Sequence, residues 1–206
     1  MFLSGFGMKK IERSGGGKRV YKGKHRLEHW SIDNQVYFIT ARCRDRYSAF
    51  RSEAAKAVFW DRFEYYTEQF GFTPWVTSLL DNHYHTLGYL KVGRNLGPMM
   101  QRIHGSVAKR VNDVLELQDL PRRKPFWKQS ANHDYFDGAI RDEKQARRAY
   151  RYKFKQGQWH GAVAAGQLYV HTRLRVRLEP AIKRSLELKA FLEGVPYKRY
   201  GGDPSR

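Results

Sequence analysis

Two histidines one residue apart are the side chains best suited to metal chemistry in this sequence. His83 and His85 flank Tyr84, and on a strand alternate residues project from one face with their β-carbons roughly 7 Å apart. Both imidazoles could then reach one ion. Spacing alone slightly favours two core histidines, because so short a motif arises easily by chance. Their expected place in the buried middle of a sheet, where imidazoles need polar partners, shifts the balance towards a metal site.

The surrounding pattern predicts the elements that position this pair. Runs of β-branched and aromatic residues predict strands, and apolar residues at helical spacing predict helices. The expected strands cover 36–42, 74–80, 85–90 and 126–128. The expected helices cover 53–70, 95–114 and 137–155. This order of elements predicts an α+β fold: a ferredoxin-like (split βαβ) antiparallel sheet with helices packed mainly on one face.

Charge indicates the partner. The chain has 206 residues, with 39 Lys and Arg against 20 Asp and Glu, a net charge of +19. The excess lies at the ends: residues 1–30 carry eight basic and two acidic side chains, residues 31–140 fifteen and twelve, and residues 141–206 sixteen and six. We expect a basic flexible leader at 1–30, a catalytic domain at 31–163 and a basic C-terminal extension at 164–206. Nucleic acid is the expected partner.

Two groups of basic residues are candidates for DNA contacts. One is a loop before the expected fourth strand, and the other is a stripe along the third expected helix, where offsets of three and four place side chains on one line. The candidates are Arg122, Arg123 and Lys124 in the loop and Lys144, Arg148, Arg151 and Lys155 in the stripe. A merely solvated surface would account for such a stripe about equally well.

Other features exclude several classes of protein. The only cysteine is Cys43, so an internal disulfide and a cysteine-built zinc site are excluded. No apolar run approaches the ~18 to 20 residues of a membrane span, and the first residues lack the pattern of a signal peptide. These features predict a soluble, cytoplasmic protein.

Several segments together resemble the REP-associated tyrosine transposases, which belong to the single-tyrosine HUH superfamily. The resemblance runs from about Val36 to Val163. It rests on the following segments: Tyr37-Phe38-Ile39-Thr40, Asn82-His83-Tyr84-His85, Phe126-Trp127, Tyr135-Phe136-Asp137 and Ile140-Arg141-Asp142-Glu143.

The resemblance implies a metal-dependent endonuclease and strand transferase that acts on single-stranded or hairpin DNA through a 5′-phosphotyrosine intermediate. His83 and His85 would bind Mg²⁺ or Mn²⁺, and Tyr135 would be the nucleophile. It also implies a nucleoid-associated, prokaryotic protein, and leaves open whether it is a monomer or a homodimer. Tyr150 and Tyr152 are the next candidates for the nucleophile.

Some residues depart from the family's pattern. Asp81 precedes Asn82 where the family has Pro, Thr86 interrupts the apolar run after the second histidine, and Gln156-Gly157 stands where the family tends to have Asn-Pro. A third metal ligand is expected one turn after the tyrosine, but Ala139 cannot coordinate; Asp137 or Asp142 could substitute.

Three alternatives remain. A noncatalytic basic protein could bind nucleic acid through aromatic stacking, with the histidines in its core. A barrel hydrolase with an HxH metal centre usually needs about 250 residues of alternating strand and helix, which this chain lacks. Relaxase and replication-initiator enzymes are further relatives, but the chain has no paired-tyrosine motif.

Overall fold

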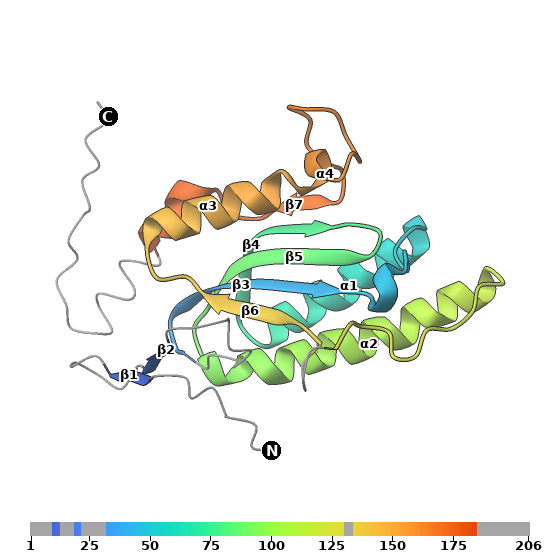
Figure 1. Ribbon diagram of the computed structural model, residues 1–206, viewed down its shortest axis with the longest axis horizontal. Helices are drawn as coiled ribbons and strands as arrows, with labels where there is room; N and C mark the ends of the chain where they lie inside the picture. The colour runs from blue at the N-terminus through green and yellow to red at the C-terminus, as the bar shows by residue number, and fades with distance from the viewer. Residues whose placement is uncertain (1–9, 13–18, 22–31, 130–133, 185–206) are drawn as a thin grey trace, which may run out of the picture.

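A five-stranded antiparallel sheet in the order β6-β3-β5-β4-β7 forms the centre of the molecule (Figure 1). The computed structural model describes residues 10–12, 19–21, 32–129 and 134–184. The strands of this sheet are β3 (Gln35–Arg42), β4 (Phe72–Leu79), β5 (His83–Leu90), β6 (Phe136–Ala139) and β7 (Thr172–Leu174).

Helices alternate with these strands along the chain. They are the 3₁₀ turns η1 (Arg44–Arg46) and η2 (Gly93–Asn95) and the helices α1 (Glu53–Gln69), α2 (Leu96–Leu117), α3 (Glu143–Phe154) and α4 (Gln156–Trp159). A further helical segment covers 178–184. The units β3-α1-β4 and β5-α2-β6 interleave, because β5 lies between β3 and β4 and β3 lies between β5 and β6. This is the predicted ferredoxin-like arrangement, which is confirmed.

The sheet has a different helix layer on each face. Helices α1 and α2 pack on one face over a large aromatic core, and α3 packs on the other with the segment 178–184. Strand β5 alternates between the two layers. Tyr84 is fully buried against α1 and α2, whereas Leu87 packs on the α3 side. His83 and His85 therefore face α3.

Two predicted elements were placed wrongly. The fourth strand is β6, which begins nine residues after Trp127; Trp127 forms only an isolated bridge with Cys43. The aromatic residues Phe126 and Trp127 predicted a strand, but they are aromatic because their rings pack into the core beneath α1 and α2. The third helix begins at Glu143 rather than at 137, since Phe136–Ala139 pairs with β3 and the Asp142 carboxylate accepts from the Gln145 amide at 2.7 Å.

Parts of both terminal regions are ordered. Within the expected leader, β1 (Lys10–Glu12) pairs with β2 (Arg19–Tyr21) in a small antiparallel sheet; the other residues up to 31 lie outside the described part. In the expected extension, β7 pairs with β4 at the edge of the main sheet. The sequence is also compatible with a helix at 183–193, of which only residues 183 and 184 lie in the described part. No helix among the described residues is long and apolar enough to cross a membrane.

Candidate active site

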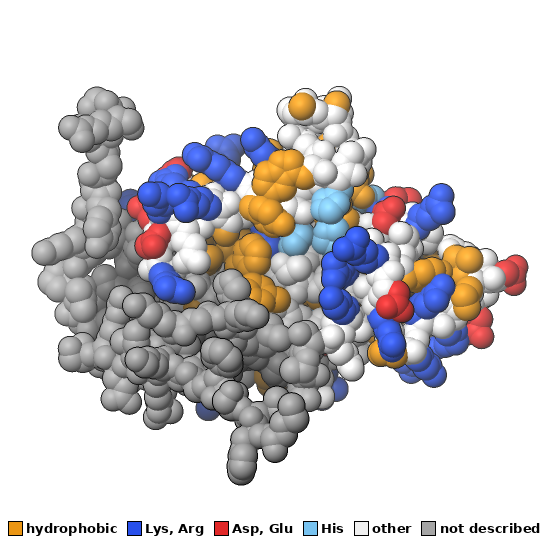
Figure 2. All heavy atoms as spheres, in the orientation of Figure 1, with side chains coloured by type: hydrophobic (Ala, Val, Ile, Leu, Met, Phe, Trp, Pro, Cys, Tyr) orange, Lys and Arg blue, Asp and Glu red, His pale blue; other side chains and the backbone are white. Residues whose placement is uncertain are grey.

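His83 and His85 lie side by side at the start of β5. Their ring centroids are 4.9 Å apart, and the residues are only 9% and 6% exposed. A third imidazole, that of His160 just after α4, lies 4.8 Å from the ring of His83. Figure 2 shows histidine side chains gathered below α4, between a hydrophobic patch and a group of basic side chains. The structure thus confirms the prediction that His83 and His85 project from the same face of the strand.

Each imidazole is oriented by polar contacts at its Nδ1 atom. The Nδ1 of His83 lies 2.6 Å from the side-chain oxygen of Asn82, to which it donates. The Nδ1 of His85 lies 2.7 Å from Thr40 Oγ1 and 3.0 Å from Lys153 Nζ. In His83 the donating Nδ1 leaves the Nε2 lone pair to bind a ligand, which is how metal-binding histidines are usually held. The same holds for His85 in the tautomer whose Nδ1 donates to Thr40 Oγ1.

Burial keeps both rings neutral. Burial, together with the neighbouring His160, Arg42 and Lys153, lowers the pKa of His83 to about 4. Burial and the neighbouring Lys153 hold the pKa of His85 well below its ordinary value. A neutral imidazole has a free lone pair, so the two rings are in the protonation state that metal binding requires.

Lys153 is an unusual neighbour for such a pair. Its side chain is fully buried, its amine lies 3.3 Å from the centre of the Phe38 ring, and burial lowers its pKa well below the ordinary value. It is within 3.3 Å of Thr40 Oγ1 as well as near His85. Lys153 thus joins α3 to the second imidazole.

Gln156 supplies the best candidate for a third ligand. The residue is fully buried, and its Nε2 donates to the Tyr152 carbonyl at 3.0 Å. Its Oε1 has no hydrogen-bond partner, although it is close enough to His83 and His85 to raise the pKa of each against the larger effect of burial. An unpartnered buried carbonyl oxygen facing two imidazoles needs a partner, and a cation is one.

Gly157 allows this close packing. A Cβ on Gly157 would lie 2.2 Å from the Cβ of Tyr169, so any side chain there would push α4 away from the loop that carries Tyr169. Glycine is required by this contact rather than by its backbone angles. The contact holds Gln156 against the sheet.

Tyr152 is the tyrosine that lies beside the histidines. Its ring centroid is 5.5 Å from that of His85, and the residue is 40% exposed. The ring of Trp159, which is 57% exposed, lies 4.9 Å from it. Because Tyr152 and Gln156 are four residues apart, they occupy one side of the turn between α3 and α4.

Tyr135 lies on the opposite face of the sheet. It packs against the core beneath α2, with its ring 5.8 Å from that of His104 on α2. Burial raises the pKa of its phenol well above the ordinary value, which makes the phenolate costly to form. The helix predicted to begin at 137, just after this tyrosine, begins only at Glu143, and Tyr135 is followed directly by β6. Tyr135 therefore does not lie near the start of the basic helix. The structure does not bring Tyr135 to the histidine pair.

The two aspartates considered as third ligands are also elsewhere. Asp137 on β6 pairs in register with Ile39, which packs on the α1–α2 side, and its charge acts on Tyr37 and Tyr135. Asp142 caps the first turn of α3, eleven residues or about 16 Å of helix from Lys153. Among the described residues, no group of three or more His, Cys, Asp or Glu side chains is arranged around a common metal position.

The predicted DNA contacts differ in how available they are. Lys144, Arg148, Arg151 and Lys155 are all exposed along α3, on the face that holds the histidines. Arg122 instead forms ion pairs with Asp113 and Glu116 on α2. Arg123 stacks over the Tyr47 ring at 3.7 Å, while Lys124 is exposed. The stripe is therefore exposed to solvent, whereas Arg122 and Arg123 are engaged in contacts within the protein.

The site residues that the sequence does not point to directly are Thr40, Lys153, Gln156 and Trp159. Gln156 was visible as a departure from the resembled family, and its spacing of four from Tyr152 is the signal that could have identified it. Lys153 and Thr40 carry no such signal, because both depend on where α3 crosses the sheet.

Comparisons with known proteins support the fold. No protein-family model matches the sequence, and no curated protein matches it significantly. The fold is similar to that of a REP-associated tyrosine transposase solved bound to a REP hairpin, with a TM-score of 0.52, 17% identity, and coverage of 69% of this chain and 76% of that one. A Deinococcus radiodurans R1 protein described provisionally as a transposase gives a TM-score of 0.43 and 14% identity, covering 63% of this chain and 95% of that one.

Proposed function

We propose that this chain, which shares its fold with a REP-associated tyrosine transposase, is a metal-dependent single-stranded DNA endonuclease and strand transferase. Tyr152 is the nucleophile in this proposal, and His83, His85 and Gln156 hold Mg²⁺ or Mn²⁺. The observation that carries it is the convergence of an exposed tyrosine, two neutral imidazoles and an unpartnered carboxamide oxygen at one place on the α3 face.

The reaction exchanges one phosphoester for another. The phenolic oxygen of Tyr152 forms a bond to phosphorus while the bond from phosphorus to the 3′ oxygen breaks. The proton lost by the phenol is balanced by the proton that the leaving 3′ oxygen takes up. The DNA 5′ phosphate stays on the protein and a free 3′ hydroxyl is released. In a later step a DNA 3′ hydroxyl attacks the phosphotyrosine, so that a new phosphodiester forms while the bond from phosphorus to Tyr152 breaks. Strand transfer therefore needs no nucleoside triphosphate.

The residues present fit a divalent ion. The Nε2 atoms of His83 and His85 and the Oε1 of Gln156 would supply two nitrogen ligands and one oxygen ligand, and the remaining positions would be left for water or phosphate oxygens, which Mg²⁺ and Mn²⁺ prefer. When bound, such an ion would withdraw charge from a non-bridging phosphate oxygen and so favour attack on phosphorus. Asn82, Thr40 and Lys153 orient the imidazoles, and Gly157 keeps Gln156 in reach.

The surface around the site suits a single strand. Trp159 offers an exposed ring on which a base could stack beside Tyr152, and base stacking of this kind is tolerant of sequence. The α3 stripe adds exposed cations for the backbone. Hairpin DNA is the proposed substrate because the similar transposase was solved with one.

A covalent-adduct assay tests the proposal. Wild-type protein incubated with a panel of end-labelled, hairpin-forming single strands and Mn²⁺ should give a protein-linked band on a denaturing gel and lose it with EDTA. Tyr152→Phe should give none. Tyr150→Phe is the matched control, because Tyr150 is on the same helix but its hydroxyl donates to the Val176 carbonyl at 3.2 Å; it should retain the adduct. An adduct of unchanged yield with Tyr152→Phe would refute the assignment. DNA binding with no adduct on any hairpin would favour a noncatalytic binding protein.

A further inference from the structure

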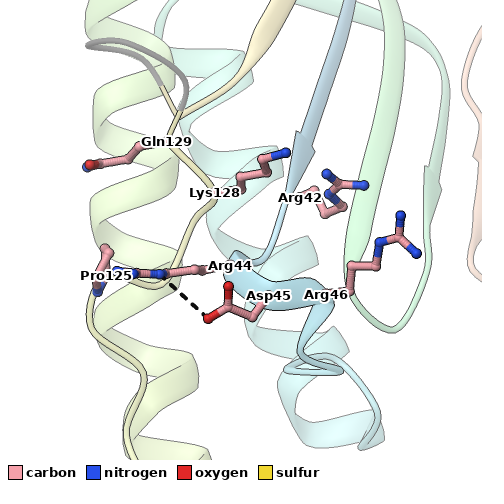
Figure 3. A pocket seen from close by; sticks show the side chains of 7 residues that line it. All are labelled: Arg42, Arg44, Asp45, Arg46, Pro125, Lys128 and Gln129. Atoms are coloured by element: carbon pink, nitrogen blue, oxygen red, sulfur yellow. Dashed lines mark ion pairs between the residues drawn. The ribbon is translucent and has the colours of Figure 1, made fainter.

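A basic pocket lies at the end of β3, beside the candidate active site. Its volume is about 610 Å³, within the size range of small-ligand sites. Four cationic side chains and one carboxylate contribute to its lining, as Figure 3 shows. They are Arg42, Arg44, Arg46, Lys128 and Asp45.

The charge of this pocket is largely uncompensated. Within the described part of the chain, Arg44 has an ion pair only with its neighbour Asp45, at 3.6 Å, and Arg42, Arg46 and Lys128 have no carboxylate partner. Other surface arginines behave differently, since Arg147 is paired with both Glu143 and Glu179. Unpaired like charges kept together in a hollow repel each other, so the arrangement is suited to an anion.

The pocket is built rather than formed by chance overlap of loops. The Arg44 amide donates to the Phe126 carbonyl at 2.9 Å, and the Lys128 amide donates to the Arg42 carbonyl at 2.7 Å. The turn between them contains two consecutive non-glycine residues in the left-handed region, Asp45 with φ 54° and Arg46 with φ 56°. Such a conformation is unfavourable for both residues, and here the turn brings Arg44 and Arg46 to the pocket that Arg42, at the end of β3, also lines.

The same turn is connected to the histidines. Arg42 is the cross-strand partner of His83, and its charge is one of the causes that lower the pKa of that imidazole. Asn82 donates to the Arg46 carbonyl at 3.0 Å while its side-chain oxygen accepts from His83. The pocket and the candidate metal site therefore share one rigid set of contacts, and Figure 2 shows basic side chains directly beside the histidines.

We infer that this pocket binds backbone phosphates of the single DNA strand as it continues past Tyr152. The inference rests on the proposed function for its direction, because the strand must cross the histidines to be cut. The Trp159 ring contacts Tyr152, which lies beside His85, whereas Arg42 of the pocket is the cross-strand partner of His83. A strand stacked on Trp159 would therefore pass the histidines before it reached the pocket. Arginines are suited to this task because their planar guanidinium groups form paired hydrogen bonds with phosphate.

Binding without metal tests the inference independently of cleavage. The probe is a fluorescent, random-sequence single-stranded 20-mer, titrated by anisotropy from 50 to 200 mM salt. For single strands the slope of log K against log salt is about −0.7 per phosphate contact, so Arg42→Gln/Arg46→Gln should make the slope shallower by about 1.4 and weaken binding about tenfold or more. Arg42→Lys/Arg46→Lys keeps the charge and should retain most of the slope.

The matched control removes equal charge from the other face. Lys109→Gln/Arg110→Gln alters two exposed cations on α2 and should leave the slope within about 0.3 of wild type. Arg46→Gln alone, at an exposed position, is the second variant should the double variant unfold, and it should make the slope shallower by about 0.7. Slopes equal to that of the control would overturn the inference.

Two further outcomes separate this inference from others. An abasic 20-mer has phosphates but no bases, so the pocket variants should lose as much affinity for it as for the normal strand. A loss confined to the base-bearing strand would overturn the assignment to phosphate. If wild type forms the Tyr152 adduct and the pocket variants bind like the control, the pocket inference alone fails. If the pocket variants bind less well but no adduct ever forms, the proposed function fails and the phosphate site stands.

Discussion

Replacing Gln156 separates metal binding from folding. Gln156→Leu has nearly the same volume and removes the one oxygen proposed to meet the ion. The matched control is Gln158→Leu, two residues later in α4, where the Nε2 also donates to a single backbone carbonyl, that of Gln167, at 2.9 Å. Each variant loses one side-chain to backbone hydrogen bond, but only Gln156→Leu loses the proposed ligand.

The magnitudes follow from the contacts of Gln156. Losing its bond to the Tyr152 carbonyl costs about 1 kcal/mol, while removing a buried oxygen that has no partner relieves about 1–3 kcal/mol. The metal-free variant should therefore be as stable as wild type, or more stable by up to about 2 kcal/mol. Mn²⁺ at a hundred times its Kd adds about 2.7 kcal/mol to the wild type, which for a chain of this length raises Tm by about 5–11 °C.

The variant should lose most of that metal effect. Losing even an outer partner of a metal site costs about 10–100-fold in affinity, and a hundredfold loss leaves about 0.4 kcal/mol at the same Mn²⁺ concentration. The expected rise in Tm then falls to about 1–2 °C. Thermal unfolding by circular dichroism, with and without Mn²⁺, measures both quantities. A full Mn²⁺ shift in Gln156→Leu, or an equal loss in Gln158→Leu, would refute the assignment of Gln156.

The other predictions concern the residues around it. His83→Ala and His85→Ala should abolish adduct formation while metal-free DNA binding stays within about twofold, because the ion serves the transition state and the basic surface the ground state; cleavage by the double variant in EDTA would contradict this. Lys153→Met should have a free energy of unfolding in urea equal to that of wild type or up to about 2 kcal/mol higher, because it removes a buried amine that has no carboxylate partner among the described residues. The variant should nevertheless cleave DNA more slowly. A loss of stability of more than about 2 kcal/mol would show that the amine is structural. Gly157→Ala should lose about 1–3 kcal/mol of stability through overpacking against Tyr169. A midpoint of urea unfolding equal to that of wild type would contradict the close contact.

Strong periodicity made most of the fold predictable. The helix beginning near Glu53 and the strands around Val36 and His85 each carry many apolar residues at one spacing, and all three are present. Strand β6 could not be recognised, because Phe136-Asp137-Gly138-Ala139 has no alternation and a strand-weakening glycine; only pairing with β3 defines it. Missing it also extended the following helix too far towards the N-terminus.

The site was predictable in part for a similar reason. The common face of His83 and His85 follows from local geometry, since strand alternation requires it. The choice among tyrosines does not, because it depends on the sheet face on which each one lies, and that is decided by the packing of α3. The sequence offers both Tyr135 and Tyr152 as candidates for the nucleophile, but only Tyr152 lies on the sheet face that holds the histidines.

The most direct test of the account is the identity of the DNA-linked residue. The adduct formed in Mn²⁺ can be digested with trypsin and nuclease, and the peptide carrying a nucleotide on its 5′ phosphate identified by mass spectrometry. We predict that the modified peptide contains Tyr152 and that the released strand ends in a 3′ hydroxyl. Modification of Tyr135, or of any tyrosine on the α1–α2 side of the sheet, would contradict the site described here.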